Sequence, residues 1–132
     1  MNKENEIYRE FKSNSFHMSA FIEKINEVNY LFESSGDGYL RIWNIETSKI
    51  YKSIQASGCQ LRGICFWNDT YIIASSNDKS FKIFDLDEPK NIVSISGHND
   101  TLLCVKKVIH PINGESLITY ATDEKIKLWC QE

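Results

Sequence analysis

The sequence predicts an all-β protein made of three tandem antiparallel sheets of four strands each. Three observations carry this prediction: an internal repeat of 41 to 45 residues, short stretches that alternate β-branched or aromatic residues with polar ones, and turn-forming residues between the stretches. A chain of 132 residues is long enough for one core and short for two. We therefore treat residues 1–132 as one structural unit.

The repeat is clearest at the end of each segment. Asp37, Asp78 and Asp123 are separated by 41 and 45 residues, and the aromatic residues at 43, 84 and 129 keep the same steps. Two independent marks with one spacing indicate a duplicated unit rather than chance.

Each repeat contains the same succession of expected strands. The first is apolar and spans 20–25, 60–66 and 102–109; the second spans 29–34, 71–75 and 116–121. A tight turn containing the aspartate leads to a third, alternating strand that ends on Trp43, Phe84 or Trp129. A more polar fourth strand is expected at 49–54 and 91–95. Four antiparallel strands per repeat form one sheet.

These segments resemble WD repeats, the family whose repeats build the four-stranded blades of β-propellers. Gly97-His98 matches the Gly-His pair of the family, and the turn aspartate and the terminal aromatic residue are present three times. The final dipeptide departs from the family pattern as Trp43-Asn44 and Trp129-Cys130. The resemblance implies blades at 17–54, 59–96 and 98–132, which together cover nearly all of the chain.

The resemblance also implies a hydrogen-bond network that links the Trp, a second-strand hydroxyl, the loop His and the turn Asp of a blade. The third repeat supplies the full set: Trp129, Thr119, His98 and Asp123. The first repeat offers Trp43, His17 and Asp37, with Glu33 where a hydroxyl is expected. The second repeat has Phe84 and Ala74 and no His, so we expect it to rely on packing.

The two ends of the chain suggest how a ring could close. Residues 7–12 precede His17 as residues 92–95 precede His98, so we expect them to form an outer strand without a blade of its own. The last blade is expected to lack its fourth strand. Because propeller rings typically use 4–8 blades, two copies could close a six-bladed homodimer by exchanging residues 7–12. The alternatives are a longer propeller, of which this chain is a part, and a different protein that supplies the missing blades.

Composition disfavours several classes of function. The 15 Lys and Arg and 18 Asp and Glu give a net charge of -3 with both signs scattered, unlike a nucleic-acid-binding surface. No apolar run approaches the roughly 20 residues that cross a bilayer, and the first residues do not resemble a signal peptide. The four cysteines form no C-x-x-C pair. We therefore expect a cytoplasmic, intracellular protein that binds neither nucleic acid nor membranes.

Catalysis has little support in the sequence. Gly36-Asp37-Gly38 is not followed by the Lys-Ser/Thr of a phosphate-binding loop, and the three histidines are widely spaced, so no metal or other cofactor is expected. A nucleophilic pair such as Cys65 with His98 has no identifiable orienting group. We predict no catalytic residues and classify the protein as a non-enzyme.

The remaining prediction is a protein-protein interaction scaffold or adaptor. By resemblance to the family, partners would contact positions next to the turn aspartates and at the starts of the first strands: Phe21, Arg62, Gly36, Asn77, Asp100 and Thr122. Arg62 and Phe21 stand out because arginine and aromatic residues dominate interface energetics, although Phe21 also suits the core. A purely structural subunit of a larger assembly remains the alternative.

Overall fold

The computed structural model describes residues 6–68 and 70–130, and in this part of the chain every regular element is a β-strand. The first sheet consists of β1 (His17–Ile25), β2 (Val28–Ser35), β3 (Tyr39–Asn44) and β4 (Lys49–Gln55). The second consists of β5 (Leu61–Asn68), β6 (Tyr71–Ser76), β7 (Ser80–Asp85) and β8 (Ile92–Ser96). The third consists of β9 (Leu102–His110), β10 (Gly114–Ala121) and β11 (Ile126–Cys130).

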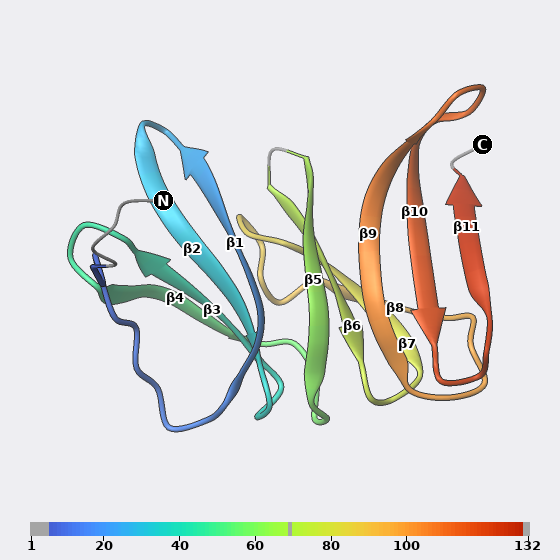
Figure 1. The fold of residues 1–132 in the computed structure, drawn as a ribbon, viewed down its shortest axis with the longest axis horizontal. Helices are drawn as coiled ribbons and strands as arrows, with labels where there is room; N and C mark the ends of the chain where they lie inside the picture. Colours follow the sequence, from blue (N-terminus) through green and yellow to red (C-terminus); the bar gives the residue numbers. More distant parts are fainter. Residues whose placement is uncertain (1–5, 69, 131–132) are drawn as a thin grey trace.

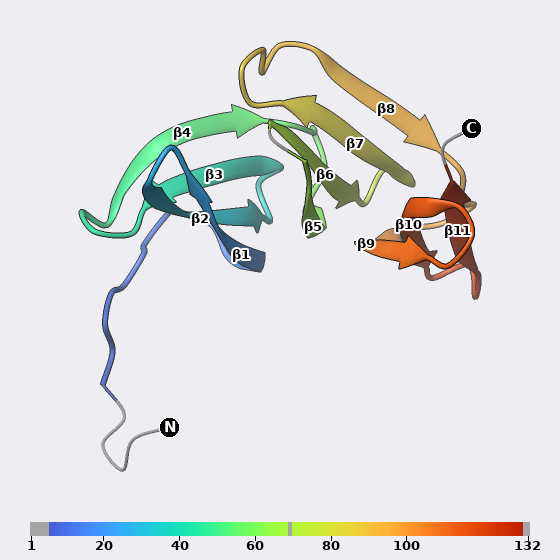
Figure 2. The ribbon, with the colours of Figure 1, turned by 90° about the horizontal axis from the view of Figure 1, so that it is seen from above.

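The strands of each sheet follow one another in antiparallel order, and the three sheets stand side by side along the chain (Figure 1). Figure 2 shows the sheets around an arc, with β1, β5 and β9 on its inner side and β4 and β8 on its outer side. We call them blades 1, 2 and 3. Within the described residues β11 pairs with β10 on one edge only, so blade 3 has three strands and the arc is not closed.

The three repeated turns have one construction. The residue after each turn aspartate has a positive φ: 83° at Gly38, 73° at Lys79 and 65° at Glu124. Each aspartate also accepts a hydrogen bond from the backbone N–H two residues on, at 3.1 to 3.2 Å. This local bond stabilises the tight turn and explains why aspartate recurs at this place.

Gly38 is required by space as well as by conformation. A Cβ atom there would lie 2.2 Å from the carbonyl oxygen of Ser57, in the segment that connects blades 1 and 2. The backbone of that segment also donates hydrogen bonds to the Gly38 carbonyl from Ala56 and Ser57. The turn of blade 1 is thereby joined to the connection that leads into blade 2.

The apolar cores lie between neighbouring blades. One cluster joins blades 1 and 2 and includes Phe32, Leu40 and Ile42 against Ile72 and Phe84, all almost fully buried. A second cluster joins blades 2 and 3 and includes Ile73 and Phe81 against Leu102, Val105 and Leu117. Each blade buries its apolar residues only by stacking on a neighbour, as expected for repeat architectures.

The all-β, three-blade fold predicted from the sequence is confirmed, with strands that begin and end within a few residues of the expected positions. Residues 7–12, expected as an outer strand, are not paired as a strand in the described chain; Figure 2 shows this segment projecting away from blade 1. Of the unit 1–132, residues 1–5, 69 and 131–132 lie outside the described residues, and the last two belong to the expected range of blade 3.

Candidate functional site

Blade 3 contains a chain of buried hydrogen bonds that runs from its outer to its inner part. The indole N–H of Trp129 donates to Oγ1 of Thr119 at 2.8 Å, and the same oxygen lies 2.8 Å from Nε2 of His98. The other ring nitrogen, Nδ1, is 2.9 Å from Oδ2 of Asp123. Thr119 is fully buried and His98 nearly so. The four side chains thus hold the β10–β11 turn against the connection between blades 2 and 3.

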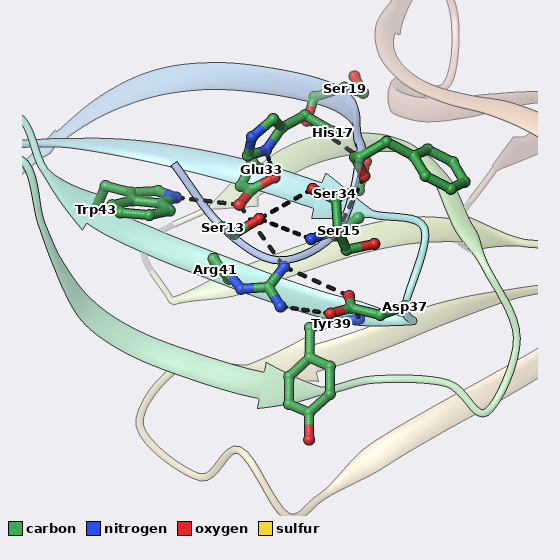
Figure 3. Close-up of polar contacts among 12 residues, drawn as sticks. Ser13, Ser15, His17, Ser19, Glu33, Ser34, Asp37, Tyr39, Arg41 and Trp43 are labelled. Atoms are coloured by element: carbon green, nitrogen blue, oxygen red, sulfur yellow. Dashed lines mark hydrogen bonds and ion pairs between the residues drawn. The ribbon is translucent and has the colours of Figure 1, made fainter. Parts of the chain in front are cut away.

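Blade 1 contains a charged version of this arrangement (Figure 3). Trp43 Nε1 donates at 3.2 Å to the carboxylate of Glu33, which is 1 % exposed. The same carboxylate contacts Nδ1 of His17, and a guanidinium nitrogen of Arg41 lies 3.8 Å away. Arg41 also forms a 2.5 Å ion pair with Asp37. Asp37 is therefore held by an arginine, whereas Asp123 is held by a histidine.

Blade 2 has Ala74 and Phe84 in the apolar core between blades 1 and 2, as expected for a repeat without the loop histidine. It does not rely on packing alone, however. The Lys82 ammonium donates to Asp78 at 2.6 Å and to Ser94 at 2.8 Å, and Ser94 in turn donates to Ser80. The turn aspartate of this blade is held by a lysine.

The ionisation of the turn aspartates follows from these partners. Burial is the largest single influence on Asp37 and Asp78 and acts to raise each pKa. The basic partner, Arg41 or Lys82, together with hydrogen bonds from nearby hydroxyl and backbone N–H groups outweighs burial and holds each pKa below its ordinary value. For Asp123 the hydrogen bonds from the backbone N–H groups of Asn99 and Lys125 and from His98 together outweigh desolvation, and its pKa is lowered. All three carboxyl groups are therefore charged at neutral pH.

The sequence analysis missed the basic residues of these networks. Arg41, Lys82 and Lys127 each stand four residues after the turn aspartate of their repeat, a regularity that is visible in the sequence. The first two pair with that aspartate, whereas Lys127 donates to the carbonyl of Gly97. The difference arises because in blade 3 the Asp123 carboxylate is already hydrogen-bonded to His98.

The predicted partner-binding residues fall into two groups. Arg62 and Asn77 come together, with Nε of Arg62 donating to Oδ1 of Asn77 at 2.7 Å. Asp100 and Thr122 are exposed and lie on adjacent loops that are joined by the 3.0 Å bond from the Thr122 N–H to the Thr101 carbonyl. The three repeated turns lie at the lower edge of the sheets in Figure 1, which we call the loop edge.

Two further predicted positions lie in packed surroundings. Phe21 stacks on Phe32 with ring centroids 4.9 Å apart and 6.3 Å from the ring of Phe66, so it contributes to the core between blades 1 and 2. Gly36 lies against the ring of Phe16, which a Cβ at Gly36 would meet at 2.5 Å.

The arc leaves one blade face uncovered at each end. On blade 3 the face that points away from blade 2 carries four large apolar residues, which we call the open face of blade 3: Ile118, Tyr120, Ile126 and Leu128. The corresponding residues of blade 1, Leu40 and Ile42, are 0 % and 2 % exposed, whereas Ile126 and Leu128 are 75 % and 50 % exposed. The open face is therefore built like an interior interface but faces solvent.

The face of blade 1 that points away from blade 2 is the complementary end. It carries Trp43 with its register neighbours Leu31, Ile22 and Ile50. We call this set the open face of blade 1. Trp43 itself is covered because Phe11 packs on it edge to face, with ring centroids 5.5 Å apart at an interplanar angle of 69°. Phe81 of blade 2 packs on Trp129 of blade 3 in nearly the same way, at 5.3 Å and 70°.

Other kinds of site have no support among the described residues. In that part of the chain no three His, Cys, Asp or Glu side chains gather closely enough to hold a metal ion. Nor does it contain a helix of the length and apolar character needed to cross a membrane. Burial raises the pKa of the Cys65 thiol to about 12, which disfavours the nucleophilic thiolate form.

Stacked antiparallel blades joined by short connections, with apolar cores only between them, define a partial β-propeller. The protein-family model described as "WD domain, G-beta repeat" matches residues 89–130, which include the Gly97-His98 pair and all strands of blade 3. This match, together with the repeated turns and strands of blades 1 and 2, supports a WD-repeat family for the chain.

Known proteins with similar sequences support this assignment. The chain is 27% identical over 103 residues to the mitotic checkpoint protein BUB3.3 of Arabidopsis thaliana, covering 78% of this chain and 31% of that protein. It is 31% identical over 86 residues to the WD repeat domain-containing protein 83 homolog of Dictyostelium discoideum, covering 65% and 26%. The chain thus spans between a quarter and a third of the length of these relatives.

The fold is shared with a solved propeller. The crystal structure of the WD40 β-propeller domain of Doa1 superposes with a TM-score of 0.76 at 20% identity, covering 91% of this chain and 38% of that one. Nearly all of the chain therefore corresponds to a continuous part of a propeller ring.

Proposed function

We propose that the chain is a non-catalytic scaffold or adaptor that binds other proteins, and that two copies complete one six-bladed ring. Membership of the WD-repeat family supports a role in protein interaction in general terms. Protein partners are favoured over nucleic acid or membranes because the charges are mixed and the net charge is only -3.

One observation carries the proposal that a ring is completed. The open face of blade 3 and the open face of blade 1 are the two kinds of surface that pack together between blades 1 and 2 and between blades 2 and 3. Exposed apolar patches of this kind mark interaction sites in soluble proteins. A second copy presents both surfaces, so two such contacts related by a twofold axis would cover every open face.

The N-terminal segment supports a second copy as the partner. Phe11 packs on Trp43 as Phe81, a third-strand residue of blade 2, packs on Trp129. Residues 7–12 also precede blade 1 in the chain as β8, the outer strand of blade 2, precedes blade 3. We infer from this order that they take the place of the outer strand of a neighbouring blade. In a closed pair that neighbouring blade is blade 3 of the other copy, which lacks an outer strand in the described chain.

The loop edge is the surface that we propose for other partners. At this edge Arg62 donates to Asn77, and the N–H of Thr122 bonds to the Thr101 carbonyl on the neighbouring loop, beside Asp100. These bonds restrain the loops and lower the entropy lost when a partner binds. Phe21, which packs in the core, could contribute only by supporting this edge. We place the protein inside the cell, where its four free cysteines, two of them exposed, would stay reduced.

A second candidate is completion of the ring by blades from a different chain. The observation that favours it is that the chain corresponds to only 38% of the matched Doa1 chain and about a quarter to a third of its relatives. In that case the open faces would be covered by blades of unlike sequence, and the isolated chain would stay a monomer.

Light scattering coupled to size-exclusion chromatography tests the proposal. We expect the unmodified chain to have twice the 15.3 kDa chain mass at micromolar concentration. Leu128→Glu places a charge on the open face of blade 3 and should give single chains. Ile112→Glu is the matched control, because Ile112 is 88% exposed in the β9–β10 hairpin, away from that face. A monomeric unmodified chain, or a Leu128→Glu chain that remains paired, would refute a second copy as the partner.

A further inference from the structure

An apolar groove of about 510 Å³ lies between blades 2 and 3, and Tyr71, Ile83, Ile95 and Trp129 are among the side chains that line it. Between blades 1 and 2 the hollow space is divided. One part of about 120 Å³ is lined by Tyr30 and Leu86 among others, and a second of about 570 Å³ is lined by Ile54 and Ile92 among others.

Between blades 1 and 2 the fourth strand of blade 2 contributes to the packed core. Ile92 of β8 lies opposite Phe84 and packs into the core between blades 1 and 2. Blade 3 has no such strand in the described chain, and the edge of β11 borders the groove between blades 2 and 3 through Trp129 and Cys130. An edge with unpaired backbone groups beside an apolar groove is the arrangement that accepts an added strand.

We propose that this edge and groove form a receptor site for one strand, residues 7–12 of a second copy, in a defined register. The inference rests on the proposed pairing of two copies and adds the register of the strand and the side chain that enters the groove. In this register Phe11 lies opposite Ile126, Glu10 opposite Lys127, Tyr8 opposite Trp129 and Ile7 opposite Cys130.

The register follows from blade 2. In that blade Phe81 and Ile95 are opposite each other, and both lie in the cluster that packs against Trp129. Ile126 stands three residues after its turn aspartate, as Phe81 does. Residues 7–12 are taken as an outer strand, and Phe11 is their residue in contact with Trp43, so we place Phe11 at the position of Ile95, the outer-strand residue of the cluster that includes Trp129. Placing Phe11 opposite Ile126 fixes every other pair because the strands are antiparallel.

The side chains at the new contact complement those already present. In blade 2 the third strand contributes Phe81 and the fourth strand Ile95 to the packing around Trp129. At the proposed contact the third strand would contribute Ile126 and the added strand Phe11 to the packing around Trp43. The two residue types are the same, with their positions exchanged. The combined side-chain volume is unchanged, which is what a closely packed interface between blades requires.

The charges also match across the proposed pair of strands. In blade 2 Lys82 donates to Ser94, the residue opposite it. Lys127 occupies the place of Lys82 and would meet Glu10, an opposite charge in a directly facing position, which stabilises antiparallel strands. Trp129 and Lys127 both face blade 2, so Tyr8 and Glu10 would face the groove.

Tyr8 is therefore the side chain that we expect to fill the groove. In the single chain its ring is largely exposed, and its hydroxyl donates to Glu46 at 3.2 Å. That surface bond is weak because water can replace it. Burial of the ring against Ile83, Ile95 and Trp129 would outweigh its loss, since burying an aromatic side chain is among the larger gains in an interface.

Disulfide trapping tests the register in the full-length chain. Ile7→Cys, in a Cys59→Ser background that removes the other exposed thiol, places a thiol directly opposite Cys130 of the second copy. Directly opposite residues lie close enough for a disulfide, so mild oxidation should convert the larger part of the chain to a covalent dimer. Lys12→Cys in the same background is the control, because in this register Lys12 lies opposite Lys125, five residues along the strand from Cys130, and the substitution leaves Ile7 and Tyr8 in place. Both positions are exposed, and circular dichroism verifies that the variants fold.

The outcomes separate this inference from the proposed function. Efficient trapping with Ile7→Cys and little with Lys12→Cys supports the register. Equal trapping of both, or trapping of Lys12→Cys alone, overturns it. A doubled solution mass without any trapping overturns the strand site while the pairing of two copies stands. A monomeric unmodified chain overturns both.

Discussion

Substitution of Thr119 by Val tests the hydrogen-bond network of blade 3. The two side chains have nearly the same shape, and Thr119 is 0% exposed, so the change removes a hydroxyl without opening a cavity. The indole N–H of Trp129 and Nε2 of His98, both 2.8 Å from that hydroxyl, lose their partner. A buried polar group left without a partner costs roughly 1–3 kcal/mol. Because Trp129 is only partly buried, we expect a total loss of about 2–4 kcal/mol in the free energy of unfolding.

Urea unfolding followed by circular dichroism at one fixed protein concentration measures this loss. With a slope of about 1.5 kcal/mol per molar urea, the midpoint should fall by roughly 1.3–2.7 M. Thr122→Val is the matched control, since Thr122 is exposed in the same blade and should change stability by less than about 0.5 kcal/mol. If Thr119→Val unfolds at the same urea concentration as the control, the network contributes nothing and the reasoning fails.

Two further predictions concern the turns. Gly38→Ala should lower the free energy of unfolding by about 3 kcal/mol or more, because Gly38 has a φ of 83° and the new Cβ would lie 2.2 Å from the Ser57 carbonyl oxygen. Gly58→Ala is the control, because a Cβ at Gly58 meets nothing within 4 Å. Equal losses of stability for the two variants in urea unfolding would contradict this account. The pKa values of Asp37, Asp78 and Asp123 are lowered in the folded chain, so these carboxylates stabilise it at neutral pH. This contribution should be lost as pH falls below about 4, because the carboxyl groups of the unfolded chain then take up protons before those of the folded chain. A free energy of unfolding that stays constant from pH 5 to pH 3 would contradict this prediction.

Most of the fold could be predicted from the repeat, because the turn aspartates and the terminal aromatic residues mark structure within a few residues of themselves. Asp37, Asp78 and Asp123 each close a turn through a bond to the backbone two residues on, so the spacing of the aspartates gives the spacing of the turns directly. The alternating strands between them follow from the need to bury one face against each neighbouring blade.

The hydrogen-bond networks of the blades could be predicted from the sequence only where each residue type has one suitable partner. The set around Trp129 has this property, since an indole, a hydroxyl and an imidazole within a blade need one another. The pairing of Lys82 with Ser94 was missed because the two residues meet only once β7 and β8 are in register. The position of Phe11 on Trp43 was missed for the same reason: the segment 7–12 is irregular, and periodicity does not place an irregular segment.

Small-angle X-ray scattering of the unmodified chain tests most directly the claim that both ends of the arc are covered by a second copy. We expect forward scattering for twice 15.3 kDa and a distance distribution that fits a closed ring of six blades. A single-chain mass across the micromolar range, or a pair whose scattering fits two open arcs joined through other surfaces, would contradict it.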